Sequence, residues 1–222
     1  MKRTIVVGDI HGCYDELNSL LRKIDFSNED GVIAVGDLTV KGPKSREILE
    51  LFSTNNQFSS VIGNHDLALV THWKNSTAPL KTSQKRTFDE LTKAGDHLLS
   101  YLDSLPGYIE LDSHIVVHGG LRPGIRLDDQ SLEDLVELRT LGADRTSRDG
   151  KPWYEEYEGG KTALFGHWPS PRPRRGRFAI GLDTGCVYGY QLTAYILDED
   201  KFVSVDAKAA YADPDRRSKA SN

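Results

Sequence analysis

One short pattern occurs three times near the start of the chain and constrains the fold more than any other feature. In each copy a run of β-branched apolar residues meets glycine and then polar residues, in the segments TIVVGDIHG (4–12), VIAVGDL (32–38) and VIGNHD (61–66). Such a segment is typical of a buried strand that ends in a polar loop. Asp9, Asp37 and Asn64 are separated by 28 and 27 positions, close to the length of a βαβ unit.

The segments between these strands are predicted to be helices. Residues 15–24 (DELNSLLRKI) place Leu17, Leu20, Leu21 and Ile24 at the spacing of one helical face. Residues 45–52 (SREILELF) indicate a second helix. A parallel sheet built from such units brings its strand ends to the same edge, which is where open α/β sheets bind ligands.

The remainder of the chain is predicted to extend this domain. Residues 65–105 have helical character and are expected to cover one side of the sheet. The polar segment 142–161 indicates a long surface loop or a short helix. Further strands are predicted at 108–111, 114–117, 163–165, 178–182, 192–197 and 202–205, and their short spacing favours antiparallel hairpins. We therefore expect one α/β (α+β) domain over residues 1–206 and a flexible tail over 207–222.

Composition excludes several classes of protein. The 222 residues are 38% hydrophobic and 27% charged, as in ordinary globular domains. A formal net charge of -5 argues against nonspecific coating of nucleic acid. The opening MKRTIVVGDIHG fits neither a signal peptide nor a membrane span, so we expect a cytoplasmic protein with no membrane partner. Cys13 and Cys186 are too few for a disulfide framework and are interpreted as reduced packing residues.

Polar residues gather at five predicted strand ends. The segments VVHGG and LFGHW add two histidines, which gives the set Asp9, His11, Asp37, Asn64, His65, His118 and His167. A single strand-end Asp or His is usually structural, but five glycine-flanked ends of this composition favour metal binding. Carboxylate, amide and imidazole ligands suit manganese, iron and zinc, and the lack of thiolate argues against a structural zinc site. Because the ligands exceed the needs of one ion, a two-metal centre with a shared carboxylate is predicted.

The ordered motifs GDIHG, GD, GNHD, His-Gly and GHW resemble those of a known family. They are similar to the metal-binding motifs of the phosphoprotein phosphatase branch of the calcineurin-like metallophosphoesterases, across residues 5–205. Within that branch, GDIHGCYDEL, GNHDL, FGHW and GLDTGCVYGYQLTAYIL (181–197) look most like the ApaH-like diadenosine tetraphosphatases. The resemblance implies a four-layer fold with a central β sandwich flanked by helices. It also implies hydrolysis of phosphoanhydride bonds in dinucleoside polyphosphates, related nucleotides or capped RNA.

The same resemblance assigns roles to the strand-end residues. One metal would be held by Asp9, His11 and Asp37, and the other by Asp37, Asn64, His118 and His167, so that Asp37 is the bridge. The implied ions are two divalent cations, with manganese expected first and iron or zinc as alternatives. Attack on phosphorus by a metal-bridging hydroxide would follow, with His65 as the general acid.

Three residues are predicted to contact the substrate. Lys41 stands where protein phosphatases of this branch carry an arginine, although a cation in a turn can also be merely solvated. Arg139, in VELRTL, resembles a second phosphate-contacting arginine. Asn64 is assigned to substrate binding as well as to metal binding.

One departure from the family pattern bears on the substrate. Protein phosphatases of the branch have an aspartate where this chain has Val40, so His65 would lose the carboxylate that supports it. A serine alkoxide has a conjugate-acid pKa of about 15 and needs a strong general acid. A phosphate that leaves an anhydride has a pKa of about 6 and needs little help. Val40 therefore favours anhydrides over phosphoproteins.

Secondary features leave alternatives open. PRPRRGR (171–177) carries four arginines that could grip polyphosphate or an RNA backbone, or could form a solvated hairpin loop. Scattered aromatic residues could stack a nucleobase but are more often core or rim residues; they are Trp153, Tyr154, Tyr157, Trp168, Tyr188 and Tyr190. Asp183 in GLDTG is interpreted as structural.

Two other functions remain candidates at this point. The first is a Ser/Thr protein phosphatase, and the second is a metal-binding module that has lost catalysis. The leading interpretation is a phosphoanhydride hydrolase that acts on a nucleotide or polyphosphate, with RNA 5' ends as a further candidate partner. Since no long exposed apolar helix calls for a partner chain, we expect a monomer.

Overall fold

The three predicted parallel strands form the centre and one edge of a five-stranded sheet. In the computed structural model, which describes residues 3–213, β1 (Thr4–Val7), β2 (Gly31–Ala34) and β3 (Phe58–Ser60) pair in parallel. β9 (Gln191–Ile196) and β10 (Lys201–Asp206) add antiparallel strands, in the order β10-β9-β1-β2-β3. The carboxyl ends of β1, β2 and β3 therefore meet at one edge, as predicted.

A second five-stranded sheet differs from the prediction in its strand directions. It contains β4 (Tyr108–Glu110), β5 (His114–Val117), β6 (Thr162–Phe165), β7 (Arg174–Arg175) and β8 (Ala179–Gly181), in the order β4-β5-β6-β8-β7. The central strands β5, β6 and β8 are parallel, and only the edge strands β4 and β7 are antiparallel to their neighbours. The expected antiparallel hairpins are therefore wrong for the centre of this sheet.

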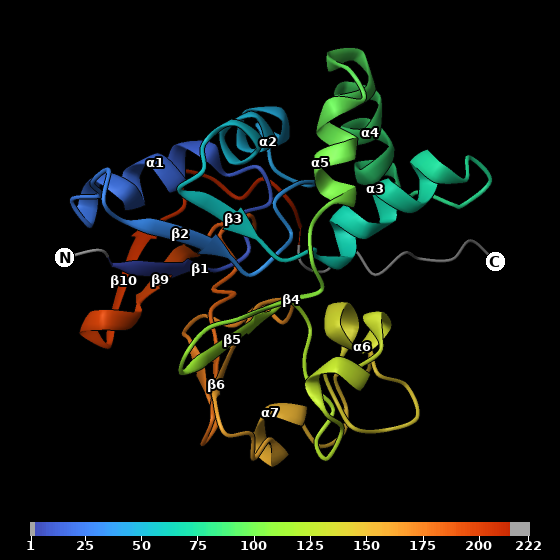
Figure 1. The fold of residues 1–222 in the computed structure, drawn as a ribbon. Helices are drawn as coiled ribbons and strands as arrows, with labels where there is room; N and C mark the ends of the chain where they lie inside the picture. The colour runs from blue at the N-terminus through green and yellow to red at the C-terminus, as the bar shows by residue number, and fades with distance from the viewer. Residues whose placement is uncertain (1–2, 214–222) are drawn as a thin grey trace.

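Helices cover the outer face of each sheet (Figure 1). On the first sheet lie α1 (Tyr14–Lys23) and α2 (Ser45–Thr54). A group of α3 (Asn64–Lys74), α4 (Thr82–Ala94) and α5 (His97–Asp103) stands beside the sheet and packs against α2. The second sheet is covered by short elements, namely η1 (Leu127–Asp129), α6 (Leu132–Glu137) and α7 (Trp153–Glu156). A further 3-10 turn, η2 (Leu197–Glu199), joins β9 to β10.

Alternation along the strands divides the core into layers. Ile5 and Val7 of β1 pack among the helices, whereas Val6 faces the interior between the two sheets. Val6 is joined there by Val116 of β5 and Leu164 of β6. Each such buried aliphatic side chain stabilises the fold by about 1.5–3 kcal/mol. The result is the predicted four-layer arrangement, in which a central β sandwich is flanked by helices.

The segment after β10 forms hydrogen bonds to the body of the protein up to residue 212. The Tyr211 hydroxyl donates to Glu16 Oε1 at 2.8 Å, and the Lys208 backbone N–H donates to the same oxygen at 2.9 Å. The Tyr211 backbone N–H donates to the Val187 carbonyl at 2.9 Å. Residues 207–212 of the expected tail thus form hydrogen bonds to the body of the protein. The boundary between a domain over 1–206 and a flexible tail over 207–222 stays a prediction, and residues 214–222 lie outside the described residues.

None of the helices in residues 3–213 combines the length and the apolar character needed to cross a membrane.

Candidate active site

The seven strand-end residues come together at one end of the sandwich, and both sheets contribute. Asp9 and His11 follow β1, Asp37 follows β2, and Asn64 and His65 begin α3 just beyond β3. The second sheet supplies the remaining two, His118 after β5 and His167 after β6. All are buried except Asn64 and His65, which are partly exposed.

Asp37 lies at the centre of this donor cluster. Its Oδ2 is 3.4 Å from His11 Nε2 and 3.5 Å from His118 Nε2. Two groups of possible ligand atoms, each within 4.8 Å of one another, both include Asp37; one adds His11 and His65, and the other adds Asp9 and His118. A carboxylate shared by two groups is what a bridging ligand requires. The second group joins Asp9 with His118, whereas the resemblance joins Asp9 with His11, and the ion that each residue holds stays a prediction.

Asn64 connects the two histidines of the second sheet. Its Oδ1 is 3.1 Å from His118 Nε2 and also 3.1 Å from His167 Nδ1. An amide oxygen and two imidazole nitrogens at these separations can share one cation, because ligands around a small divalent ion lie about this far apart. The predicted second ligand set is therefore brought together.

Backbone carbonyls orient two of the imidazoles for ligation. His11 Nδ1 lies 2.9 Å from the Thr39 carbonyl, and His118 Nδ1 lies 2.8 Å from the Val35 carbonyl. Because a carbonyl can only accept, the proton of each neutral ring is placed on Nδ1 and the lone pair on Nε2. Those Nε2 atoms are the ones that approach Asp37, so the tautomers suit metal binding.

Several site residues have an unusual backbone conformation. φ is positive at His11 (47°), Asp37 (49°), Lys41 (72°) and His167 (66°), and also at the β-branched Val40 (70°). Such conformations cost about 1–3 kcal/mol each and concentrate where function requires a particular geometry.

Two of the motif glycines allow close approach at the site. A Cβ on Gly63 would overlap the backbone and carboxylate of Asp37, and a Cβ on Gly166 would overlap the carboxylate of Asp9. The glycines that precede the donors in GNHD and GHW are thus needed for the strand ends to meet.

Asp66 is a positioning residue that the sequence did not single out, although GNHD ends in it. Its carboxylate accepts from the backbone N–H groups of Leu38 (3.0 Å) and Thr39 (3.1 Å) and from the Thr39 hydroxyl (2.6 Å). Burial, followed by the nearby Asp37, raises the pKa of Asp66 to about 6. This aspartate fixes the loop that carries Asp37 against the start of α3.

The electrostatics of the donor cluster favour a bound cation. Burial raises the pKa of Asp37 to about 6 and that of Asp9 well above its usual value, and it lowers the pKa of His118 to about 4. Burial also lowers the pKa of both His11 and His167. A divalent ion would offset the cost of burying the carboxylates, and the neutral imidazoles are already in the form that ligates metals. The residues therefore fit the two metal ions that were predicted.

The two predicted phosphate-binding cations both reach the cluster. Lys41 Nζ lies 3.0 Å from His11 Nε2 and 5.3 Å from the centroid of the Tyr188 ring. Arg139 donates to the His167 carbonyl at 3.3 Å and to the Thr146 carbonyl at 2.9 Å. Their positions suit contacts to the oxygens of a phosphate group bound at the donor cluster.

The arginine-rich segment is largely engaged within the protein. Arg174 donates to the carbonyls of Trp168 and Pro169, both at 3.2 Å, and its guanidinium lies 4.6 Å from the Trp168 ring centroid. Arg175 and Arg177 lie over the rings of Phe202 and Phe178, at 4.8 and 5.1 Å. These contacts favour a structural role for three of the four arginines over a grip on RNA.

Most of the aromatic candidates are also explained by packing. Trp153, Tyr154 and Tyr157 are buried in the core behind the second sheet, which leaves no face for a nucleobase. Tyr188, by contrast, lies against Lys41. Asp183 Oδ1 accepts from the Gly185 backbone N–H at 3.0 Å, in keeping with the structural interpretation. Burial raises the pKa of Asp183 to about 6.

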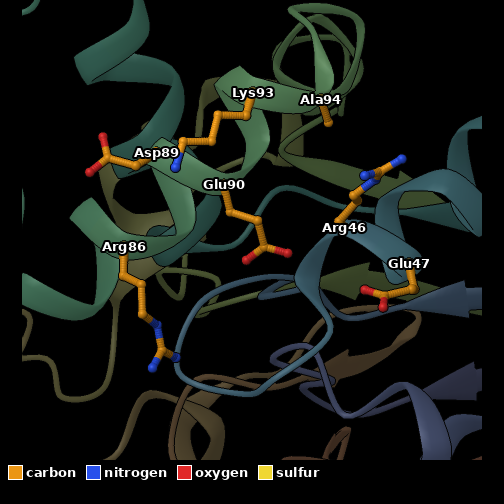
Figure 2. A pocket seen from close by; sticks show the side chains of 7 residues that line it. All are labelled: Arg46, Glu47, Arg86, Asp89, Glu90, Lys93 and Ala94. Carbon is orange, nitrogen blue, oxygen red and sulfur yellow. The ribbon is translucent and has the colours of Figure 1, made fainter.

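A separate cleft of about 680 Å³ lies between α2 and α4 (Figure 2). The charged residues that line it have both signs, and they are Arg46, Glu47, Arg86, Asp89, Glu90 and Lys93. None of the predicted site residues lines this cleft, and its mixed charge does not suit a polyphosphate. Arg86 connects it to the site, because its guanidinium donates to the Lys41 carbonyl at 3.4 Å.

Comparison with known proteins identifies the family of this chain and two of its relatives. The family model described as calcineurin-like phosphoesterase matches residues 2–204. Bis(5'-nucleosyl)-tetraphosphatase PrpE [asymmetrical] of Bacillus subtilis is 30% identical and is matched over 93% of this chain and 95% of its own. The symmetrical bis(5'-nucleosyl)-tetraphosphatase of Vibrio parahaemolyticus is also 30% identical, over 92% and 98% of the two chains.

Two solved structures have a similar fold. One described as "Crystal structure of a putative diadenosine tetraphosphatase" has a TM-score of 0.80 and 32% identity, and the match covers 92% of this chain and 93% of that one. A Ser/Thr phosphatase from Saccharomyces cerevisiae has a TM-score of 0.66 over 96% and 81% of the two chains. Because its identity is only 17%, this second likeness shows a common fold alone.

Proposed function

Because this chain belongs to the calcineurin-like phosphoesterase family, we propose that it hydrolyses phosphoanhydride bonds in dinucleoside polyphosphates such as diadenosine tetraphosphate. The family and the relatives named as tetraphosphatases make the chain a metal-dependent phosphohydrolase.

The observation that carries the substrate proposal is the environment of His65. Within residues 3–213, no carboxylate is hydrogen-bonded to its ring, and Val40 is fully buried in the apolar core. After burial, the groups with the largest effect on the pKa of His65 are Lys41, His11 and Lys81, and each of them lowers it. An imidazole in such surroundings is poorly suited to protonate an alkoxide, but a phosphate with a pKa of about 6 leaves without that help.

The proposed reaction uses the residues already described. Water loses one proton to the solvent and its oxygen forms a bond to phosphorus. The bond between phosphorus and the bridging oxygen breaks, and the leaving phosphate keeps the electron pair. Two divalent ions, for which we propose manganese, would be held by the donor cluster and would supply Lewis-acid chemistry. Lys41 and Arg139 bind the non-bridging oxygens, and His65 donates a hydrogen bond to the leaving phosphate.

The proposal is tested by turnover on four substrates. Purified protein with Mn²⁺ is assayed on diadenosine tetraphosphate, capped RNA, inorganic polyphosphate and a phosphoserine peptide. We expect kcat/KM to be highest for diadenosine tetraphosphate. Faster turnover of the phosphopeptide than of every anhydride would support a protein phosphatase instead, and no turnover with two metals bound would support a metal-binding module.

The products of the same assay identify the bond that is cut. Attack at the central anhydride of diadenosine tetraphosphate gives two molecules of ADP, whereas attack at an outer one gives ATP and AMP. Separation of the nucleotides by chromatography distinguishes the two outcomes.

A further inference from the structure

A neutral side chain from α4 stands beside the His65 ring. Gln84 is buried, with 5% of its surface exposed, and its Nε2 lies 3.4 Å from His65 Nδ1. The two residues are 19 positions apart on neighbouring helices, so this contact depends on the packing of α4 against α3. The separation of 3.4 Å is at the long end for a hydrogen bond, and hydrogen bonds to catalytic groups are often long in the absence of substrate.

The orientation of the Gln84 amide follows from its other partner. Gln84 Oε1 accepts from the Lys81 backbone N–H at 2.8 Å, as the third residue of a helix does in a capping box. A backbone N–H can only donate, so the atom facing Lys81 must be the oxygen. The NH₂ group is then the part that faces His65, and it must donate to Nδ1.

This direction of donation fixes the tautomer of the histidine. A ring nitrogen that accepts a hydrogen bond carries the lone pair, so the proton of the neutral His65 ring lies on Nε2. A ring nitrogen of His65 also lies within 4.8 Å of ligand atoms on His11 and Asp37, which places the imidazole at the edge of the donor cluster. In this tautomer, the neutral His65 ring can donate a hydrogen bond only through Nε2.

We propose that Gln84 is a positioning residue that holds His65 in the Nε2–H tautomer and thereby selects substrates whose leaving group needs a hydrogen bond rather than a full proton. The inference rests on the proposed function, since it concerns the leaving group of that reaction. A carboxylate at the same place would accept from Nδ1–H and stabilise the charged ring, as in Ser-His-Asp triads. The amide does the reverse, because it presents N–H to Nδ1.

Gln84→Glu tests this most cleanly, because a glutamate retains the oxygen that caps Lys81 and reverses only the polarity toward His65. Thr82→Glu is the matched control, since it adds the same charge in the same helical turn at an exposed position. Thermal unfolding of both variants checks that the fold is retained.

The first readout is the tautomer itself. ¹⁵N NMR of the metal-free protein reports which ring nitrogen is protonated, and His65→Ala identifies the His65 signal among the histidines. We expect Nε2–H in the wild type and in Thr82→Glu, and protonation of Nδ1 in Gln84→Glu. A wild-type His65 that carries its proton on Nδ1 would overturn the proposal. Because this readout needs no turnover, it remains decisive even if the enzyme proves to act on another substrate.

The second readout is the preference for leaving groups. In Gln84→Glu, the kcat for an alkyl phosphomonoester relative to that for diadenosine tetraphosphate should rise by at least about tenfold, which is a modest part of the general-acid effect. The ratio should not change in Thr82→Glu. An equal ratio in the wild type and in Gln84→Glu would show that Gln84 does not select the leaving group.

Discussion

The two sides of the site differ in how their side chains are held. In the donor cluster, His11 and His118 are oriented by backbone carbonyls, and the Asp9 carboxylate accepts from the His167 backbone N–H at 3.1 and 3.2 Å. The other side of the site consists of His65, Lys41 and the side chains that contact them, and we call it the leaving-group side. Its contacts are between side chains, with Gln84 against His65 and Tyr188 against Lys41.

This difference separates what binds metal from what selects substrate. A backbone carbonyl keeps its place when a neighbouring side chain is substituted, so the orientation of His11 and His118 comes with the strand ends, although Asn64 also contacts His118 and His167 through its side chain. Side-chain contacts can be changed by a single substitution without altering the fold. The substrate preference should therefore be adjustable on the leaving-group side while the metals stay bound.

The largest effect is expected from Asp37→Asn, because Asp37 is the carboxylate common to both ligand groups. We expect the number of bound metal ions to fall below two and kcat to drop by about a thousandfold or more, as losing much of a two-metal centre's charge stabilisation should. Metal analysis after dialysis and steady-state kinetics measure both. Asp183→Asn is the control, since this buried aspartate accepts a hydrogen bond from the Gly185 backbone N–H. If Asp183→Asn lost as much metal as Asp37→Asn, the assignment of Asp37 as the bridging ligand would be contradicted.

A smaller effect is expected from Lys41→Met on the other side of the site. Losing the ammonium should lower kcat/KM by about a hundredfold, comparable to removal of one donor to an oxyanion, while both metals remain bound. Lys44→Met lies three residues along the same loop, where Lys44 Nζ pairs with Asp15 at 2.7 Å on the surface, and should behave as the wild type. If Lys41→Met lost metal, the distinction between a side that binds metal and a side that selects substrate would be contradicted.

The smallest effect on catalysis is expected far from both sides, at Asp30. Its carboxylate accepts from Arg3 Nε at 3.0 Å and from Arg3 Nη2 at 2.7 Å, and the hydrogen bond from Arg3 holds its pKa well below the usual range. Asp30→Asn should lower the free energy of unfolding at neutral pH by about 1–3 kcal/mol and leave kcat unchanged.

The pH dependence of this loss follows from the lowered pKa. A carboxylate favoured in the folded state contributes its stability above the unfolded pKa of about 3.9, and the contribution disappears as the pH falls through the folded value. The difference in stability between wild type and Asp30→Asn should thus shrink below about pH 4 in denaturant titrations. A difference that grows toward acid pH would contradict the pairing with Arg3.

The sequence predicts those parts of the fold that depend on residues close together in the chain. The strand ends that carry Asp9, Asp37 and Asn64 were predictable because each strand, glycine and polar residue are adjacent, and amphipathic helices separate them at the spacing of βαβ units. The directions of β5 and β6 were not predictable in this way. The crossover between them contains the 3-10 turn η1 and the short helices α6 and α7, which give too little periodicity to reveal a parallel connection.

Contacts between distant residues account for the other differences. Residues 207–213 looked like a tail because their apolar residues have no period, yet Tyr211 reaches Glu16 in α1. Gln84 and Asp66 were missed for a related reason, since their roles depend on partners that only the folded chain brings near. Val40, whose identity was informative in the sequence, proves to lie in the core at a positive φ.

The central claim is that the leaving-group side is built for a group that departs with little proton transfer, and His65→Ala tests it most directly. The measurement is kcat for wild type and variant, both with two metals bound, on diadenosine tetraphosphate and on an alkyl phosphomonoester. We predict a loss of less than about tenfold on the anhydride and a larger loss on the monoester, because even a weak acid matters more to an alkoxide than to a phosphate. Equal losses on the two substrates would contradict the account.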